Sequence, residues 1–203
     1  MSELPRPAPD DPLPLAQQWL AEAERSGAKN PWAMALATVA ANGKPAVRYV
    51  LLKEFSTQAG YIVFYTNYGS RKAQELDHAG HAAAVLYWPD PGRQLRLEGS
   101  IERSPAAESD AYFAARPRES QLNAWASQQS RPIESPDRMA AQIAAMNAKF
   151  PAATAIDRPA GWGGYRLQIQ AIEFWTEGQN RFHERLRFER LSGRGWSSAW
   201  LQP

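Results

Sequence analysis

The chain lacks cysteine entirely, and its 203 residues include only three histidines. Without cysteine there can be no disulfide, thiolate nucleophile, zinc ribbon or iron–sulfur cluster. The histidines lie at positions 78, 81 and 183, a set too small and too scattered for a dedicated metal site. We therefore expect neither a bound metal ion nor cysteine chemistry.

The sequence also lacks an apolar run of membrane-spanning length. Its first residues, MSELPRPAPDDPLP, are acidic and proline-rich, and they contain neither the basic nor the apolar segment of a secretory signal. The formal net charge of +2 is too small to favour nucleic-acid binding. We expect a cytoplasmic protein without a membrane or nucleic-acid partner.

The chain does have enough apolar residues for one sizeable core, since 44% of its residues are hydrophobic and 11% are aromatic. We expect a single domain over residues 1–203, with a flexible lead at 1–11. Short strands at close spacing, interrupted by helices rather than alternating with them, favour a mainly β fold with helices (α+β). The expected architecture is an antiparallel barrel with a helical insertion at 104–150.

Turn and cap signals divide the chain into elements. Asp11-Pro12, Ser104-Pro105 and Ser135-Pro136 each have the form of a helix N-cap followed by proline at the first helical position. Asn42-Gly43 predicts a hairpin between two β-patterned runs. The predicted helices follow these caps, with further helical pieces at 70–78 and 117–128. The predicted strands cover 33–40, 46–55, 61–66, 81–88, 94–103, 165–175, 181–191 and 196–201.

A cluster of charge opens the predicted strand 181–191, which begins Arg-Phe-His-Glu-Arg. Strand periodicity places Arg181, His183 and Arg185 on one face. Two guanidinium groups that flank an imidazole suit a phosphorylated, redox-active or acid/base ligand. A solvated basic strand edge would show the same pattern, so these residues alone leave both interpretations open.

A second candidate site lies where the predicted strand 61–66 gives way to a helix. Residues 65–72 place a glycine turn, the hydroxyl of Ser70 and the cations Arg71 and Lys72 at the helix start. The free N–H groups and partial positive charge of a helix N-terminus suit a phosphate. An ordinary capped helix with solvated cations is the alternative interpretation.

Two further cations, Arg48 and Lys53, lie in an otherwise apolar predicted strand. Strand parity places them on opposite faces. One ligand could therefore contact both only at a bulge, at a strand end or through a long side chain. Cations at the rim of a barrel, without a ligand, are the alternative.

Six segments carry a more specific signal. In order they are RYVLLK (48–53), FYTNYGSRKAQEL (64–76), WPDPGRQLRLEG (88–99), YFAARPRESQLNAWASQQS (112–130), GWGGYRL (161–167) and IEFWTEGQNRFHER (172–185). Over residues 13–198 the chain resembles the pyridoxine/pyridoxamine 5′-phosphate oxidase family. The resemblance implies an FMN-binding split barrel that forms a homodimer, with FMN in each of two clefts between the subunits.

The resemblance also implies an activity in vitamin B6 metabolism. Pyridoxamine 5′-phosphate and pyridoxine 5′-phosphate would be oxidised to pyridoxal 5′-phosphate. A hydride would leave the C4′ carbon of the substrate for N5 of the flavin, and oxygen would reoxidise the flavin with release of hydrogen peroxide. The amine substrate would also release ammonia. The protein would hold the substrate against the flavin and adjust the charge around both.

Position by position, the resemblance implies roles for residues of this chain. It implies cofactor binding by Arg48, Val50, Leu51, Lys53, Tyr65, Thr66, Ser70, Arg71, Lys72, Gln94, Gln129, Ser130, Trp175 and Arg185. It implies substrate binding by Lys53, Tyr112, Arg116, Ser120, Arg181 and His183, with Arg181 and His183 also catalytic. Gln129 and Ser130 would come from the other subunit. Since Pro117 interrupts the spacing of the substrate residues, we expect a helix end or kink there.

The chain departs from the family at both ends. Family members usually have a longer basic amino-terminal arm that folds over the substrate, and MSELPRPAPDD does not show its arginine–tyrosine pattern. Trp200 stands where the family-like tail has an arginine. Two other functions stay open. A phenazine-type oxidase would use the same FMN site for an unphosphorylated aromatic substrate, and a non-catalytic module would bind flavin or pyridoxal phosphate without turnover. Lys53, Arg116 and Ser120 favour a phosphorylated substrate.

Overall fold

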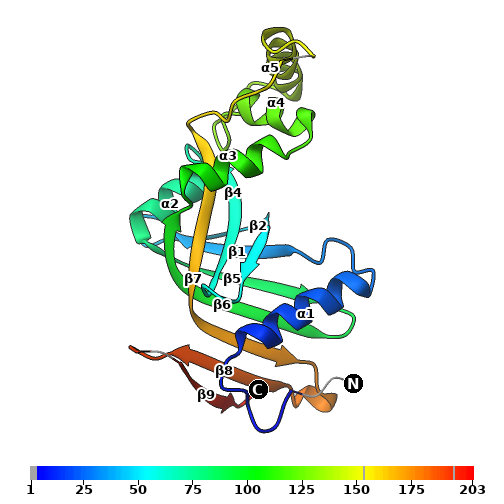
Figure 1. The fold of residues 1–203 in the computed structure, drawn as a ribbon, viewed down its shortest axis with the longest axis vertical. Coiled ribbons are helices and arrows are strands. Elements are labelled where there is room, and N and C mark those ends of the chain that lie inside the picture. The colour runs from blue at the N-terminus through cyan, green and yellow to red at the C-terminus, as the bar shows by residue number, and fades with distance from the viewer. Residues whose placement is uncertain (1–3, 153, 194) are drawn as a thin grey trace.

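The computed structural model describes residues 4–152, 154–193 and 195–203. Within these residues, nine strands form one antiparallel sheet that curls on itself (Figure 1). One helix packs across the sheet, and a group of helices extends from one end of it. The predicted mainly β antiparallel fold is confirmed. No helix among the described residues is both long and apolar enough to cross a bilayer.

The elements follow the predicted order. The strands are β1 (Ala33–Val39), β2 (Pro45–Leu51), β3 (Glu54–Ser56), β4 (Tyr61–Asn67), β5 (His81–Trp88), β6 (Arg93–Arg103), β7 (Trp162–Thr176), β8 (Glu184–Arg190) and β9 (Trp196–Leu201). The helices are α1 (Leu13–Arg25), α2 (Arg71–Ala79), α3 (Ala106–Ala114), α4 (Arg118–Ala126) and α5 (Pro136–Lys149), with a 3₁₀ turn η1 (Gln179–Arg181). Three helices, α3 to α5, occupy the predicted insertion.

The long strand β7 divides the sheet into two wings. One edge of β7 pairs with β6 along its length, while the other edge pairs first with β4 and then with β8. The register between β6 and β7 shifts at Glu98/Gly99. A Cβ atom at Gly99 would collide with the backbone carbonyl of Gln168, so only glycine permits this close approach. The bulge bends the sheet and lets β4 and β8 face different directions.

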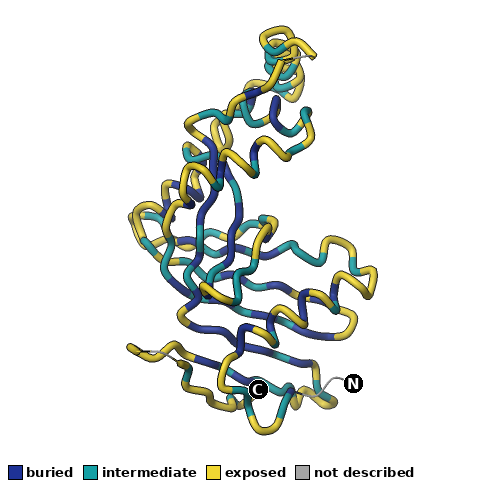
Figure 2. The backbone as a smooth tube through the Cα atoms, in the orientation of Figure 1, coloured by how far each residue is buried: buried dark blue, intermediate teal, exposed yellow. Residues whose placement is uncertain are grey.

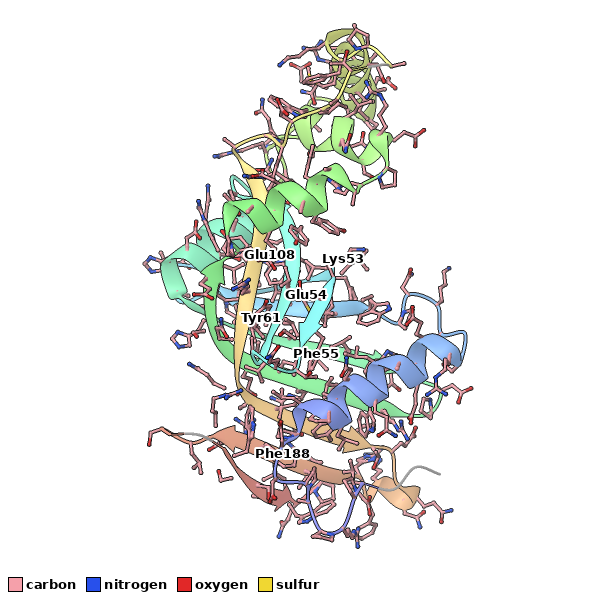
Figure 3. The ribbon with its side chains drawn as sticks, in the orientation of Figure 1. Lys53, Glu54, Phe55, Tyr61, Glu108 and Phe188 are labelled. Carbon is pink, nitrogen blue, oxygen red and sulfur yellow. The ribbon has the colours of Figure 1, made fainter. Side chains whose placement is uncertain are left out.

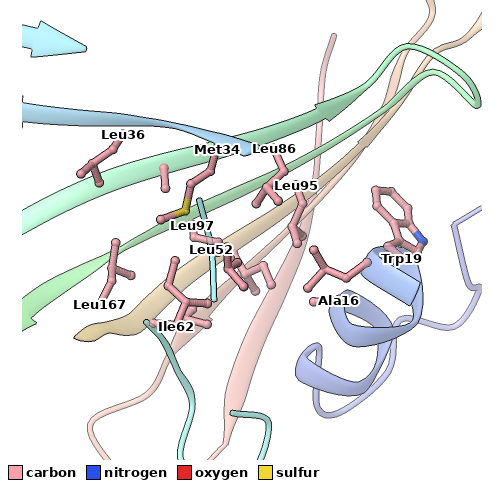
Figure 4. Packing of buried hydrophobic residues seen from close by; sticks show 14 of the residues in the cluster. Ala16, Trp19, Met34, Leu36, Leu52, Ile62, Leu86, Leu95, Leu97 and Leu167 are labelled. Atoms are coloured by element: carbon pink, nitrogen blue, oxygen red, sulfur yellow. The ribbon is translucent and has the colours of Figure 1, made fainter. Parts of the chain in front are cut away.

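The core lies on the inner face of the curled sheet and beneath α1 (Figure 4). Buried residues alternate along β1 and β6, as expected for strands with one buried face. Trp19 of α1 meets Phe174 of β7 edge to face, with ring centroids 5.1 Å apart. Residues inside the curled sheet are buried, whereas many residues of α3, α4 and α5 are exposed (Figure 2).

The amino-terminal segment lies against the rest of the molecule. Leu4 is buried in the core, and Arg6 forms an ion pair with Glu184 and lies over the ring of Trp200. The carboxylate of Asp11 accepts a hydrogen bond from the Leu13 N–H, which confirms the predicted start of α1 within one residue. Residues 1–3 of the predicted lead lie outside the described residues.

Three strand predictions are wrong in their bounds. The predicted strand 165–175 begins three residues earlier, at Trp162, and the other two contain a break. The predicted strand 46–55 is two strands, because the chain leaves β2 after Leu51 and buries Leu52 in the core before β3 begins. The predicted strand 181–191 begins only at Glu184, since Asn180 and Arg181 have left-handed φ values of 53° and 66°. Both breaks fall at candidate site residues.

Candidate functional site

A cleft of about 590 Å³ lies between β2, the end of β4, the start of α2 and the insertion helices. Four cationic side chains line it, from Arg48, Lys53, Lys72 and Arg116. None of its described lining residues is acidic. It also takes in the predicted site residues Val50, Leu51, Tyr65, Thr66, Tyr112 and Gln129. The positive charge of the lining favours an anionic ligand.

Arg48 and Lys53 both reach the cleft because β2 ends between them. Arg48 lies within β2, whereas Lys53 follows Leu52 and its backbone N–H donates to the Val63 carbonyl of β4 at 2.8 Å. The chain therefore crosses from one strand to another at this point, and strand parity no longer separates the two cations. Of the three arrangements that could bring them together, the strand end is the one observed. Figure 3 shows Lys53 next to β3.

The side chains of Thr66, Lys72 and Gln129 form a closed hydrogen-bonded group at the inner end of the cleft. The Lys72 ammonium donates to the Thr66 hydroxyl at 3.0 Å and to Gln129 Oε1 at 2.9 Å, and Thr66 donates to the same Gln129 oxygen at 2.9 Å. Burial, and then the nearby charge of Arg48, lowers the pKa of Lys72. Within the described chain Gln129 reaches the cleft of its own chain, whereas the resemblance implied that it would come from the other subunit.

Ser70 and Arg71, at the start of α2, lie beside the cleft rather than in its lining. Ser70 is fully buried, and its hydroxyl accepts a hydrogen bond from the Ala73 N–H at 3.4 Å. For Ser70 the capping interpretation is therefore confirmed, and its side chain is not available to a ligand in the cleft. Arg71 is exposed and pairs with Glu75 at 2.7 Å. Of the three residues Ser70, Arg71 and Lys72, Lys72 is the one that lines the cleft.

A stack of aromatic rings forms the other wall of the cleft. Tyr65 of β4 stacks on Tyr112 of α3 with centroids 3.9 Å apart, and its other neighbour is Trp162, at 5.4 Å. The guanidinium of Arg116 lies 4.6 Å from the Trp162 ring. Burial raises the pKa of Tyr65 and lowers that of Arg116. Among the described residues, Arg116 Nη1 is a buried donor without a hydrogen-bond partner.

Trp162 is a lining residue to which the sequence prediction gave no role. It lies in the segment GWGGYRL, so the signal was an aromatic residue inside a recognised motif. The predicted break near Pro117 is confirmed, because α3 ends at Ala114 and α4 begins at Arg118. As a result, Ser120 does not line the cleft with Tyr112 and Arg116.

The remaining predicted residues gather in a different part of the sheet. Gln94 of β6, Trp175 of β7 and Arg185 of β8 are direct cross-strand neighbours, so they lie side by side on one face. We refer to these three as the β6–β8 row. Arg185 donates to the buried carboxylate of Glu173 at 2.8 Å, and this hydrogen bond raises the pKa of Arg185. The pairing fixes the guanidinium at the edge of the row.

Arg181 and His183 project from the turn that joins β7 to β8. The predicted strand face for them is wrong, because both residues precede β8 and Arg181 has a left-handed backbone. His183 nevertheless returns to the row, since its ring lies 4.6 Å from that of Trp175. Its Nδ1 accepts from the Gly178 N–H at 3.3 Å, which leaves the proton of a neutral ring on Nε2. Arg181 is exposed.

The cleft and the β6–β8 row do not share residues within one chain. In Figure 3, Lys53 marks the cleft and Phe188 of β8 marks the part of the sheet that holds the row, and the two lie well apart. Ser130 also falls outside the cleft lining, next to Gln129 on the loop before α5. Among the described residues, no group of three or more His, Cys, Asp or Glu side chains is placed to bind a metal ion.

A curled, antiparallel sheet with inserted helices and a cation-lined cleft defines a split-barrel protein with a site for an anionic ligand. Residues 20–150 match the family described as pyridoxamine 5′-phosphate oxidase. Residues 162–203 match the pyridoxine 5′-phosphate oxidase C-terminal dimerisation region. The chain therefore belongs to the pyridoxamine 5′-phosphate oxidase family.

Curated relatives extend the match along nearly the whole chain. A pyridoxine/pyridoxamine 5′-phosphate oxidase from Cereibacter sphaeroides is 49% identical over 197 residues, covering 97% of this chain and 96% of the relative. One from Rubrobacter xylanophilus is 46% identical, covering 95% of this chain and 88% of the relative.

Solved structures resemble the fold. The PhzG protein of Burkholderia lata, in complex with tetrahydrophenazine-1-carboxylic acid, superposes with a TM-score of 0.89 at 31% identity and covers 98% of this chain and 95% of its own. A pyridoxamine 5′-phosphate oxidase-related, FMN-binding protein of Nostoc punctiforme has a TM-score of 0.75 at 19% identity, covering 95% of this chain and 97% of its own. At that identity the second comparison speaks to the fold alone.

Proposed function

We propose that this protein is an FMN-dependent oxidase of vitamin B6 phosphates. In the proposed reaction, pyridoxamine 5′-phosphate, water and oxygen give pyridoxal 5′-phosphate, ammonia and hydrogen peroxide. Pyridoxine 5′-phosphate and oxygen give pyridoxal 5′-phosphate and hydrogen peroxide. The names of the relatives from Cereibacter sphaeroides and Rubrobacter xylanophilus support this activity, because the similarity to them spans nearly the whole chain.

The observation that carries the proposal is the charge of the cleft. Arg48, Lys53, Lys72 and Arg116 line it without an acidic residue among its described lining. FMN and the substrate each carry a phosphate, so one site must neutralise two anionic groups. A buried guanidinium nitrogen without a partner, as at Arg116, fits an oxygen acceptor that a ligand would bring.

The cofactor phosphate fits the inner end of the cleft. We assign its binding to Arg48 and Lys72, with Arg71 at the margin and Thr66 and Gln129 as neutral partners. Bound FMN would supply a two-electron acceptor that oxygen can reoxidise. Burial and neighbouring charges already hold these side chains in place, so little side-chain ordering would remain when the cofactor binds.

The substrate phosphate fits the outer wall, where Lys53, Tyr112 and Arg116 lie. The stack of Tyr112, Tyr65 and Trp162 restricts the rotation of each ring. The guanidinium of Arg116 also packs over the Trp162 ring.

We assign the reacting end of the substrate to Arg181 and His183. Because Nδ1 of His183 accepts the Gly178 N–H, its Nε2–H is free to donate to an oxygen of the substrate ring. Trp175 packs against the imidazole and fixes its plane. Arg181 would orient the pyridine ring and polarise the reacting carbon. The left-handed backbone at Arg181 is a strained conformation, of a kind that is often retained at functional sites.

These residues can meet the cleft only if a second copy of the chain brings them. We propose a homodimer in which the β6–β8 row and the turn of one chain complete the cleft of the other. The match of residues 162–203 to a dimerisation region supports this arrangement. So do two large apolar side chains, Tyr49 at the cleft and Phe182 at the turn, each 77% exposed in the single chain.

A phenazine-type oxidase is the second candidate, because the PhzG structure superposes closely on this fold. The two candidates differ in the need for a substrate phosphate. A phosphate carries more negative charge and more acceptor oxygens than a carboxylate, so it makes fuller use of Lys53 and Arg116. Both cations favour the B6 phosphate.

An aerobic assay tests the proposal. The purified protein, reconstituted with FMN, should consume oxygen and form pyridoxal 5′-phosphate and peroxide with pyridoxamine 5′-phosphate or pyridoxine 5′-phosphate. Unphosphorylated pyridoxamine should be a much poorer substrate. FMN binding without peroxide from either phosphate would support a non-catalytic module. Equal turnover of the phosphorylated and unphosphorylated forms would remove the role proposed for the phosphate-binding residues.

A further inference from the structure

A buried carboxylate lies directly behind the cations of the cleft. Glu75 of α2 is 4% exposed, and both of its oxygens are engaged. Oε1 accepts from Arg71 Nε at 2.7 Å, and Oε2 accepts from Arg48 Nη2 at 2.9 Å and from the Thr38 hydroxyl. Arg48 in turn donates to the same hydroxyl. Three elements, β1, β2 and α2, therefore meet at one carboxylate.

The charges of this cluster do not cancel. Burial alone would raise the pKa of Glu75, but hydrogen bonds from Thr38, Arg71 and Arg48 together lower it, so the group is a carboxylate. One negative charge thus faces the two guanidinium groups, with the ammonium of Lys72 on the same helix. The positive excess is presented to the cleft, where Arg48 and Lys72 form part of the lining.

The geometry points to Glu75 as a positioning residue for the cofactor phosphate. It holds Arg48 and Arg71 in fixed orientations beside Lys72 and reduces the repulsion among the three cations while no anion is bound. This inference rests on the proposed FMN function. The role of Glu75 goes beyond the proposed function, because Glu75 does not line the cleft and would act only through the two arginines.

The substitution Glu75→Gln separates this role from simple packing. Glutamine has nearly the shape of glutamate, but it is neutral and one of its two acceptor oxygens becomes an NH₂ donor. That donor would face Arg48 or Arg71, both of which can only donate. One guanidinium would lose its charge-assisted partner and its fixed orientation. Glu75→Asp keeps the charge with a shorter reach, so it should recover part of the loss.

Comparison of FMN with riboflavin provides the readout, because riboflavin has the same ring and ribityl chain but no phosphate. We titrate apoprotein with each flavin and follow the quenching of flavin fluorescence. Glu75→Gln should weaken FMN binding about tenfold and leave riboflavin binding within about twofold of wild type. Glu75→Asp should lie between wild type and Glu75→Gln. Glu24→Gln, the same chemical change at an exposed position of α1, should bind both flavins as wild type does.

Each result bears on one claim. If wild-type protein binds FMN no better than riboflavin, the proposed cofactor site itself is wrong. If wild type prefers FMN but Glu75→Gln loses both flavins equally, or loses neither, the positioning role is wrong. Should Glu75→Gln fail to fold, Thr38→Val removes one hydrogen bond to the same carboxylate at nearly constant shape. It should then give a smaller loss confined to FMN, and an unchanged FMN preference would overturn the inference.

Discussion

The cleft and the turn between β7 and β8 both contain cationic side chains, but they differ in how far those side chains are buried. In the cleft, Lys72 is buried and hydrogen bonded to Thr66 and Gln129. In the turn, Arg181 is exposed on a left-handed backbone, next to Phe182 with 77% of its surface exposed. One region is organised within a single chain, and the other displays its functional groups to the outside.

The difference indicates which part of the site each chain completes alone. Buried, paired cations can hold a phosphate without further ordering. Exposed groups on a strained turn need a surface to pack against before they can orient a substrate. In the proposed function, the cleft holds the cofactor-binding charge but neither Arg181 nor His183, so it is half of a site and the turn is the other half. The proposed homodimer joins them, which explains why both regions belong to one protein.

The largest effect should come from the turn. Arg181→Ala should lower kcat/KM for pyridoxamine 5′-phosphate by about 100-fold or more, because it removes a group proposed to act on the reacting carbon. FMN binding, followed by the yellow absorbance of the purified protein, should be retained. Arg138→Ala on α5, where the arginine is also exposed, serves as the control and should keep wild-type kinetics. Turnover close to wild type in Arg181→Ala would contradict the role of the turn.

A smaller effect should come from the outer wall of the cleft. Arg116→Ala should raise KM for pyridoxamine 5′-phosphate by about 10- to 100-fold, since it removes a charge-assisted contact to the substrate phosphate. Steady-state kinetics should show a smaller change in kcat. The same variant should treat unphosphorylated pyridoxamine much as wild type does. An equal loss with both substrates would mean that Arg116 supports the fold rather than the phosphate.

The smallest effect is a pH dependence of cofactor binding. Burial lowers the pKa of Lys72 in the empty cleft; Arg48 lowers it further and Glu75 raises it. A bound phosphate would favour the charged ammonium, so the pKa rises on binding and a proton is taken up. FMN affinity should therefore fall severalfold as pH rises through the pKa of Lys72 in the free protein.

Fluorescence titrations across the alkaline range measure that fall. Lys72→Arg keeps its charge throughout this range and should show a flatter dependence. An alkaline fall of equal size in Lys72→Arg would assign the titration to another group.

Helix caps, the hairpin turn and the helix break could be predicted from the sequence, because each is determined by a few neighbouring residues. The caps at Asp11 and Ser135, the hairpin at Asn42-Gly43 and the break at Pro117 each depend on short-range geometry and are confirmed. The cations Arg48 and Lys53 were found as candidates by type, and the strand end that unites them required only one local break. For these residues sequence and structure agree.

Long-range features could not be read in this way. Glu75 meets Thr38 and Arg48 only because α2 packs on β1 and β2, and nothing near Glu75 in the sequence marks it. Gln129 meets Thr66 and Lys72 although about sixty residues separate it from them in the sequence. The turn before β8 was predicted as strand since alternation of charge and apolar residues imitates strand periodicity. Of the two left-handed residues in this turn, Asn180 is of a type that adopts this backbone more often than most, but Arg181 carries no such signal.

A mixed dimer tests most directly whether each site is built from two chains. One chain would carry Lys53→Ala with Arg116→Ala, and the other Arg181→Ala. If the cleft of one chain uses the turn of its partner, the purified heterodimer has one intact site, and about half of the wild-type kcat/KM for pyridoxamine 5′-phosphate should return. If each chain used its own turn, both sites would be defective. A heterodimer as inactive as the two parent homodimers would contradict the account.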